Sequence, residues 1–233
     1  MENGERIDEI IYPILKDVWG YSDFRPMQRE IIHQIMLNRD LLAILPTGGG
    51  KSICFQVPAL AKRGICIVVS PLIALIKDQV QNLKKLNIKA LSVHSGMSYR
   101  EVDIALDNAI YGNYKFLYLS PERLNTQLFR ARVSRMDVSM IVVDEAHCIS
   151  QWGYDFRPDY LTISQIKSEV ARNRRDVDSE FIPHDVPIIA LTATATEKVA
   201  DDICDRLSFA SKNIIRSGFD RPNLSYLVKQ TEN

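Results

Sequence analysis

The sequence predicts an α/β fold in which helices cover both faces of a mainly parallel sheet of about seven strands. Short apolar runs recur along the chain, and segments with apolar residues at three- and four-residue spacing lie between them. This alternation is typical of a parallel sheet whose strands are connected by helices. With 233 residues, 46% of them hydrophobic, the chain is long enough to bury a sizeable core as one large domain.

The apolar runs predict seven strands, at residues 41–45, 65–69, 90–93, 116–119, 140–143, 188–191 and 213–216. The helical spacing predicts helices at residues 26–37, 51–61, 73–86, 98–110 and 197–207. We expect one domain at residues 1–216, whose first 38 residues form helices upstream of the first strand, and a linker at residues 217–233. The most polar stretch, residues 171–187, predicts a solvated loop or a frayed helix end.

Charge and cysteine content exclude several classes of protein. Lys plus Arg and Asp plus Glu number 29 each, so no overall positive field attracts nucleic acid, and any such affinity must come from local patches. The four cysteines lie far apart, which predicts buried reduced thiols and neither a zinc site nor disulfides. No run approaches a signal peptide or the ~18 apolar residues of a membrane helix. We expect a cytoplasmic protein with no membrane partner.

A glycine-rich turn joins the first apolar run to the next helix and reads Thr47-Gly48-Gly49-Gly50-Lys51-Ser52. Glycines let backbone N–H groups approach an anion, and the following helix points its positive end at it. Lys51 is expected to reach the β- and γ-phosphates of ATP, and the Ser52 hydroxyl to bind Mg²⁺. Leu45 stands where the strict phosphate-loop pattern has glycine. The alternative is a tight turn that binds nothing.

Two acids follow the apolar run at residues 140–143, in the sequence Asp144-Glu145-Ala146-His147. Asp144 and Glu145 are expected to hold Mg²⁺, partly through water, and to position the attacking water. Acids in this place can also simply cap a helix. The glycine turn and the acids, in this order, predict a site that hydrolyses ATP.

Further motifs make the chain resemble, over nearly all its length, the first motor domain of the RecQ-type DNA helicases of superfamily 2. They are Phe24-Arg25-Pro26-Met27-Gln28, Ser70-Pro71-Leu72-Ile73-Ala74-Leu75, Ser120-Pro121-Glu122-Arg123-Leu124, the run from Cys148 to Pro158, Leu191-Thr192-Ala193-Thr194-Ala195 and Phe219-Asp220-Arg221-Pro222-Asn223. The resemblance implies a RecA-like P-loop NTPase fold and a 3′-to-5′ DNA helicase of DNA repair and recombination, associated with the nucleoid if bacterial. It implies a monomer that acts on single-stranded and tailed duplex DNA, with a second RecA-like domain that supplies arginines to the ATP site.

The resemblance also assigns an adenine site to the motif upstream of the first strand. The Gln28 amide is expected to read the adenine edge, because an amide can donate and accept at once. Tyr21 is expected to stack on the base, and Arg25 to approach it or brace the phosphate loop. For Tyr21, the alternative is ordinary packing beside Trp19.

An aromatic-rich segment follows the acids and contains Trp152, Tyr154, Phe156 and Arg157. In the family it couples DNA binding to hydrolysis. Aromatic faces can stack on unpaired bases, at ~1–3 kcal/mol for each base, and arginine can hold a phosphate or stack. The alternative, that Trp152 and Phe156 fill a core gap, is disfavoured by the polar, turn-rich setting.

The resemblance implies that His147, Thr192 and Thr194 couple the ATP site to its neighbours. From the residues alone, His147 is equally compatible with a packing residue, and the threonines with strand-end hydroxyls that cap the next helix.

Two turns after predicted strands, Ser70-Pro71 and Ser120 with Arg123, are expected to contact DNA phosphates, because backbone N–H groups at a helix start can bind an anion. For Arg123, a solvated surface cation is the alternative.

Two other functions compete with the helicase: a nucleotide-dependent DNA-binding switch that never unwinds, and another superfamily 2 translocase, which the segment around Trp152 disfavours.

Overall fold

The structure is a computed structural model that describes residues 2–152, 155–177 and 186–217. Tyr154 and, apart from Ser217, the predicted linker at residues 217–233 lie outside the described residues. Among the helices described, none is both long and apolar enough to cross a membrane.

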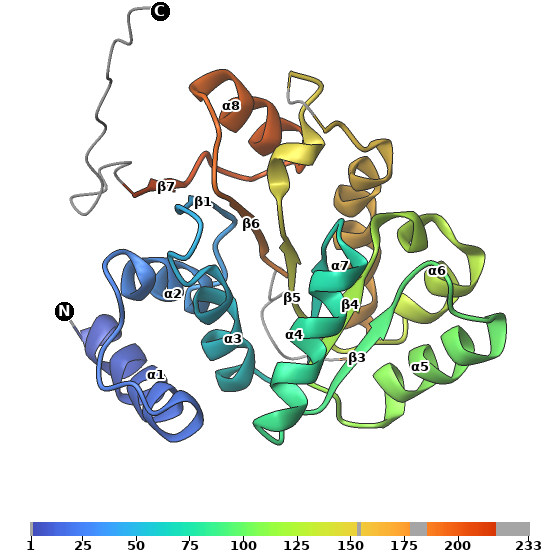
Figure 1. Ribbon diagram of the computed structural model, residues 1–233, viewed down its shortest axis with the longest axis horizontal. Coiled ribbons are helices and arrows are strands. Elements are labelled where there is room, and N and C mark those ends of the chain that lie inside the picture. The colour runs from blue at the N-terminus through green and yellow to red at the C-terminus, as the bar shows by residue number, and fades with distance from the viewer. Residues whose placement is uncertain (1, 153–154, 178–185, 218–233) are drawn as a thin grey trace, which may run out of the picture.

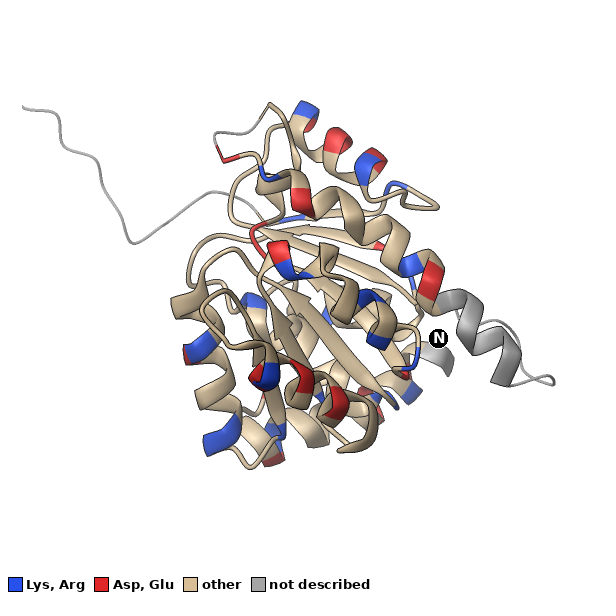
Figure 2. Ribbon diagram, turned by 90° about the vertical axis from the view of Figure 1, so that its right-hand side faces the viewer, with Lys and Arg blue, Asp and Glu red and all other residues tan. Residues whose placement is uncertain are grey.

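Seven strands form one sheet, in the order β3-β4-β2-β5-β6-β1-β7, and every pairing between them is parallel. The strands are β1 (Leu41–Ile44), β2 (Ile65–Val69), β3 (Ala90–Val93), β4 (Phe116–Leu119), β5 (Val138–Val143), β6 (Ile188–Thr192) and β7 (Ile214–Arg216). The predicted α/β fold is confirmed, and each predicted strand is present with its ends shifted by two residues or less. Figure 2 shows the charged residues on helices and loops, while the strands are almost free of them.

Eight α-helices and three 3₁₀ helices are present in the described parts of the chain. They are α1 (Glu2–Trp19), α2 (Gln28–Met36), α3 (Lys51–Ala61), α4 (Ile73–Lys85), α5 (Tyr99–Tyr111), η1 (Pro121–Asn125), α6 (Gln127–Val133), η2 (Ala146–Ile149), η3 (Pro158–Thr162), α7 (Ile163–Val177) and α8 (Glu197–Arg206). The five predicted helices correspond to α2, α3, α4, α5 and α8, while α6, α7 and the 3₁₀ helices were not predicted.

The polar stretch at residues 171–187 begins inside α7, so its first part is a helix end and not a loop. Ile163, Ile166 and Val170 are buried at three- and four-residue spacing, which anchors this helix to the core. Residues 178–185 lie outside the described part of the chain.

Helices cover both faces of the sheet, as predicted (Figure 1). Because successive strand residues point to opposite faces, Ile67 and Ile141 pack with α5, α6, α7 and α8, whereas Val68 and Met140 pack with α2, α3 and α4. Helix α1 packs outside this second layer, in a cluster that contains residues of α2 and α3.

The topology brings four predicted motifs to one edge of the sheet. Strands β2, β5, β6 and β1 are consecutive neighbours, and the carboxyl ends of parallel strands meet at the same edge, where ligands of such sheets bind. The turns that begin at Leu45, Ser70, Asp144 and Ala193 therefore lie side by side.

Candidate active site

The glycine turn connects β1 to α3 in a backbone conformation that favours glycine. Gly48 and Gly50 have φ values of 79° and 75°, which side chains with a Cβ rarely adopt. A Cβ on Gly50 would lie 2.3 Å from Gln28 Nε2, so a larger residue would have to displace Gln28. No side chain caps the start of α3 at Gly50. The Ile53 N–H donates to the Gly50 carbonyl at 3.1 Å, and the N–H groups of Lys51 and Ser52 before it stand where an anion can bind a helix start.

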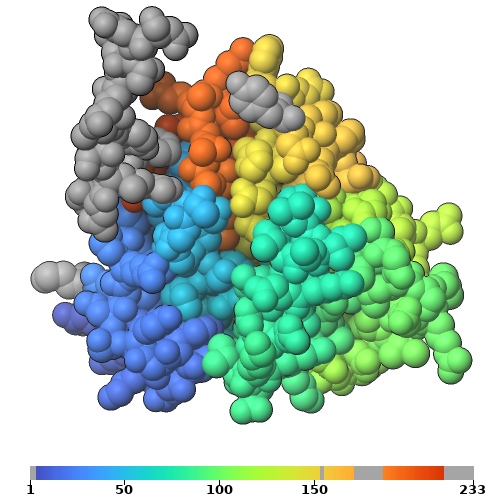
Figure 3. Space-filling view, viewed as in Figure 1, coloured from blue at the N-terminus to red at the C-terminus, as the bar shows by residue number. Residues whose placement is uncertain are grey.

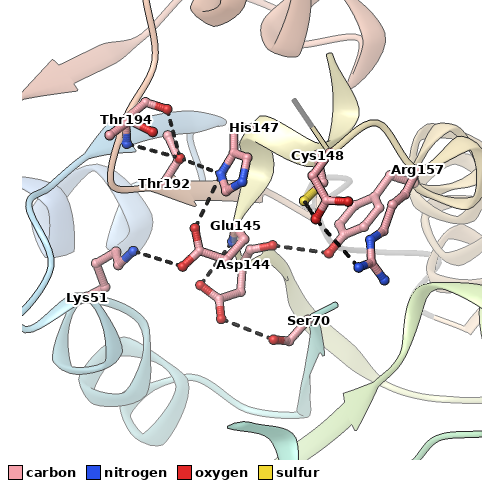
Figure 4. A network of polar contacts seen from close by, with 11 residues as sticks. Lys51, Ser70, Asp144, Glu145, His147, Cys148, Arg157, Thr192 and Thr194 are labelled. Atoms are coloured by element: carbon pink, nitrogen blue, oxygen red, sulfur yellow. Dashed lines mark hydrogen bonds and ion pairs between the residues drawn. The ribbon is translucent and has the colours of Figure 1, made fainter. Parts of the chain in front are cut away.

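Lys51, at the start of α3, points toward the acids at the end of β5 (Figure 4). Its Nζ lies 3.4 Å from Glu145 Oε1, and Asp144 Oδ2 accepts a hydrogen bond of 3.2 Å from the Ser70 hydroxyl. Glu145 has φ 48° and ψ 49°, a left-handed conformation that is costly for a residue with a side chain. This turn leads the chain from β5 into η2 and aims the Glu145 carboxylate at Lys51 and His147.

The two adjacent carboxylates have opposite pKa shifts. Burial and then the charge of Glu145 raise the pKa of Asp144, and Lys51 only partly offsets this. The hydrogen bond from His147, assisted by Lys51, lowers the pKa of Glu145 against the effect of burial. A buried carboxylate beside a second negative charge is an environment that a cation would relieve.

The donor set fits Mg²⁺, which prefers oxygen ligands and takes most of them from water and phosphates. Asp144 and Ser52 offer a carboxylate and a hydroxyl. Within the described residues, no group of three or more His, Cys, Asp or Glu side chains forms a metal cage of its own.

His147 connects the acids to the end of β6. Its Nδ1 lies 3.3 Å from Glu145 Oε2 and 3.1 Å from Thr192 Oγ1. The Thr192 hydroxyl donates to the Thr194 carbonyl at 3.1 Å and accepts from the Thr194 N–H at 3.4 Å. Hydrogen bonds with the Cys148 thiol and the Glu145 carboxylate raise the pKa of His147 to about 10. The three predicted coupling residues thus form one chain of contacts.

The adenine motif is in contact with the phosphate loop. Arg25 Nη1 donates to the Gly48 carbonyl at 2.6 Å, a contact that a brace for the phosphate loop, one of the two roles predicted for Arg25, would require. Gln28 is 3% exposed; its Nε2 donates to the Gly50 carbonyl at 3.0 Å and its Oε1 accepts from the Arg25 N–H at 2.9 Å. Tyr21 is 53% exposed, which disfavours core packing and leaves its ring open to a base.

The predicted aromatic segment is only partly a core element. Trp152 is 63% exposed, and Phe156 is half-buried. Arg157 Nη1 donates to the Pro71 carbonyl at 3.4 Å, and its Nη2 pairs with Asp155 Oδ2 at 3.5 Å. This arginine therefore connects the aromatic segment to the turn after β2.

The structure does not offer Ser70 and Ser120 themselves to a DNA phosphate. Both are buried, their hydroxyls bond Asp144 and Glu122, and their N–H groups donate to the Leu119 and Val93 carbonyls. Pro71 is also buried. These groups are satisfied within the sheet and its turns, so a phosphate could meet only the turns that follow.

Arg123 is likewise held within the protein, and it is not the solvated cation of the alternative. Its Nη2 donates to the His94 carbonyl at 2.8 Å, so the guanidinium fixes the loop after β3.

Tyr160 is a residue of the site that the sequence did not indicate. Its ring is fully buried, and its hydroxyl donates to the Asp144 carbonyl at 3.3 Å. The only signal in the sequence was a tyrosine within a partly apolar run, and a buried tyrosine hydroxyl needs a partner.

A family model of DEAD/DEAH box helicases matches residues 25–203. The ATP-dependent DNA helicase RecQ of Bacillus subtilis (strain 168) is 44% identical over 222 residues, which are 94% of this chain and 35% of the relative. The ATP-dependent DNA helicase Q-like 4B of Arabidopsis thaliana is 41% identical over 220 residues, which are 91% of this chain and 18% of the relative.

Among solved structures, the helicase domain of Pyrococcus furiosus Hef aligns with a TM-score of 0.63 and 22% identity. The alignment covers 89% of this chain and 40% of that one, and it shows a shared fold. The chain spans about a third of the length of the RecQ helicases of Bacillus subtilis, Pasteurella multocida and Haemophilus influenzae that it matches.

Proposed function

Because the chain belongs to the DEAD/DEAH box helicase family, we propose that it is the ATP-binding motor domain of a RecQ-type DNA helicase. The RecQ relatives confirm the resemblance drawn from the sequence motifs. The observation that carries the proposal is the meeting of Lys51, Asp144, Glu145 and His147 at one edge of the sheet. The proposed reaction is ATP hydrolysis coupled to 3′-to-5′ movement along single-stranded DNA and to unwinding of tailed duplexes in repair and recombination.

The proposed enzyme has a second motor domain, acts as a monomer and is found where the cell keeps its DNA. Residues 1–216 form the first RecA-like domain, and a second one completes the ATP site in a monomeric enzyme. Its location follows that of DNA, in the cytoplasm, at the nucleoid, or in a nucleus.

Nucleotide binding requires Lys51 to change partners. Its ammonium now lies at the Glu145 carboxylate, and a γ-phosphate at the start of α3 would attract it more strongly because phosphate carries more charge. Release from Lys51 leaves Glu145 free to accept a proton from, and so orient, the attacking water. Mg²⁺, when bound, neutralises charge on the β- and γ-phosphates, and Ser52 and Asp144 are the residues that would hold it.

His147 carries this change away from the site. Its imidazole contacts both the Glu145 carboxylate and the Thr192 hydroxyl. A shift of Glu145 when Lys51 departs therefore alters a hydrogen bond at the end of β6. This is a physical route from the nucleotide to the turn between β6 and α8.

The test is Lys51→Ala in the full-length protein. Hydrolysis of ATP should fall by about 10²–10³-fold, because charge that develops on the phosphates loses its cation. Lys84→Ala, an exposed lysine near the end of α4, is the matched control and should turn over like the wild type. Unchanged turnover in Lys51→Ala would refute the phosphate-loop assignment.

A strand-separation assay on a 3′-tailed duplex, run with the wild-type protein in the same mixture, separates the helicase from the switch. Unwinding coupled to hydrolysis supports the helicase. DNA-stimulated hydrolysis without strand separation would instead support a nucleotide-dependent DNA-binding switch.

A further inference from the structure

Helix α8 lies beside the segment that follows β5, as both the ribbon and the space-filling view show (Figures 1 and 3). The helix begins after Thr196, whose hydroxyl accepts from the Val199 N–H at 3.3 Å. Lys198, Asp202 and Arg206 are four residues apart and so share one face of this helix. We call these three residues the α8 docking face.

Each residue of the α8 docking face contacts the segment after β5. Lys198 Nζ lies 3.2 Å from the centroid of the Trp152 ring, and Arg206 Cζ lies 5.9 Å from the centroid of the Phe156 ring. Between them, Asp202 Oδ2 accepts a hydrogen bond of 2.7 Å from the Ser150 hydroxyl. Two of the three aromatic residues expected to stack on DNA bases, Trp152 and Phe156, are thus each approached by a cation from the same helix.

Asp202 organises these contacts. Its Oδ1 accepts from Arg206 Nε at 2.7 Å, and the Ser150 hydroxyl that it binds accepts from the Trp152 N–H at 3.2 Å. Burial acts to raise the pKa of Asp202, but the hydrogen bonds from Ser150 and Arg206 outweigh it and lower the pKa. Asp202 is therefore ionised at neutral pH and holds both the arginine and the start of the aromatic segment.

A cation within about 6 Å of an aromatic face is attracted by the ring, and a base that stacks on the ring needs the same face. An indole with an ammonium 3.2 Å from its centroid cannot offer that face to a base. The two interactions are mutually exclusive on that side of the ring.

We propose that the α8 docking face holds Trp152 and Phe156 in a resting position, and that single-stranded DNA must displace Lys198 and Arg206 to stack on their rings. The proposal rests on the proposed function, because DNA is the displacing ligand. In it, Lys198 and Arg206 compete with the bases, while Asp202 is a positioning residue. The cost of displacement lowers the apparent affinity for DNA.

The experiment uses the fluorescence of Trp152 in the 233-residue chain. The chain contains 2 tryptophans, so Trp19→Phe leaves Trp152 as the only reporter. In this background, Lys198→Ala should increase quenching by acrylamide without DNA, because the covered face of the indole opens. It should also lower the half-saturating concentration of an oligothymidylate by about two- to fivefold, the strength of an exposed cation–π contact.

Two variants serve as controls. Lys198→Arg keeps a cation over the ring and should restore both values. Lys212→Ala removes the same charge beside the same helix, where Lys212 pairs with Asp201 and Asp205. Lys212 lies over no aromatic ring among the described residues, so this variant should change neither value.

The competition between Lys198 and DNA and a phosphate contact by Lys198 change DNA affinity in opposite directions. Weaker oligothymidylate binding by Lys198→Ala would show that Lys198 holds a DNA phosphate, and it would overturn the competition. Unchanged acrylamide quenching would overturn the docking contact itself. Increased quenching in a chain whose Trp152 emission no oligothymidylate alters would leave the docking contact standing but overturn the proposed DNA function and the displacement.

Discussion

The position of Gln28 changes the role expected for its side chain, from recognition of adenine to support of the phosphate loop. The amide was expected to read adenine, yet its two polar atoms are bonded to the Gly50 carbonyl and the Arg25 N–H inside the protein. The side chain is also almost wholly buried. Contact with adenine would require the amide to release the phosphate loop, so Gln28 acts first on the shape of that loop.

We therefore expect Gln28→Ala to weaken binding of ADP and of pyrophosphate alike, by about threefold to tenfold, the value of one or two net hydrogen bonds. Pyrophosphate lacks a base, so its loss of affinity can only come through the phosphate loop. Isothermal titration of the two ligands measures this. Gln34→Ala, on the same helix but away from the loop, is the control, and a loss confined to ADP would restore adenine reading as the main role.

The hydrogen bonds of His147 with Cys148 and with Glu145 make stability depend on pH. The raised pKa of His147, about 10, means that its contribution is fully present below the ordinary imidazole value and is lost as pH rises through about 10. The lowered pKa of Glu145 keeps its carboxylate ionised at neutral pH. The difference in free energy of unfolding between wild type and His147→Gln should be smaller at pH 10 than at pH 6, by on the order of 1 kcal/mol. Urea unfolding at the two values measures it, and a constant difference would mean a neutral imidazole.

At the level of single residues, the sequence predicted the residues of the ATP site but not the residues that hold them in place. Lys51, Asp144 and Glu145 were predicted because glycines, lysine and acids at strand ends have few other uses in this order. Tyr160 and Asp202 were not, since their partners Asp144 and Ser150 become neighbours only when separate elements pack. Local spacing carries no signal of that kind.

Among the elements, strand β1, which lies between β6 and β7 in the sheet, depends on one buried acid at its start. Asp40 precedes β1 and binds Lys167 Nζ of α7 at 2.7 Å. It also accepts from the Ile188 N–H at 2.8 Å and the Ala210 N–H at 3.3 Å. One carboxylate thus joins β1, β6, α7 and the turn after α8, at the end of the sheet opposite the acids.

Removal of this carboxylate by Asp40→Ala should lower the free energy of unfolding by about 3–5 kcal/mol, because an ammonium and two N–H groups lose their partner in a buried place. Urea unfolding measures the loss. Lys212→Ala removes an exposed ion pair and should leave the free energy of unfolding nearly unchanged, because solvent screens such pairs. Asp40→Ala combined with Lys167→Met should recover part of the loss; equal stability of wild type and Asp40→Ala would show that the carboxylate holds nothing together.

All seven strands were predicted, whereas several helices were not, and the reasons are physical. Parallel strands covered on both faces appear as continuous apolar runs, which is why all seven were found. Helices α6, η1, η2 and η3 are only one or two turns long, too short for a spacing of three and four residues to repeat. Helix α7 was missed because a polar stretch follows its buried positions.

For the whole molecule, the order of strands in the sheet assembles the site. This order could not be predicted from the sequence pattern. The motifs after β1, β2, β5 and β6 are dispersed along the chain, and they meet because these strands are consecutive in the sheet. The alternation of strands and helices predicted a parallel sheet, but many strand orders satisfy that alternation.

The last prediction concerns the 233-residue chain on its own. Thr47 and Gly48 are exposed, so a nucleotide on this loop has one side open to water, which weakens its electrostatic contacts. In the proposed mechanism a second domain supplies arginines to that side, and such arginines are worth ~10³–10⁵ in rate in nucleotide hydrolases. We expect this chain to bind Mg·ATP weakly, hydrolyse it slowly and separate no strands of a 3′-tailed duplex. ATP turnover and strand separation measured in parallel, with the full-length protein as the positive control, test this, and robust unwinding by residues 1–233 would refute the need for a second domain.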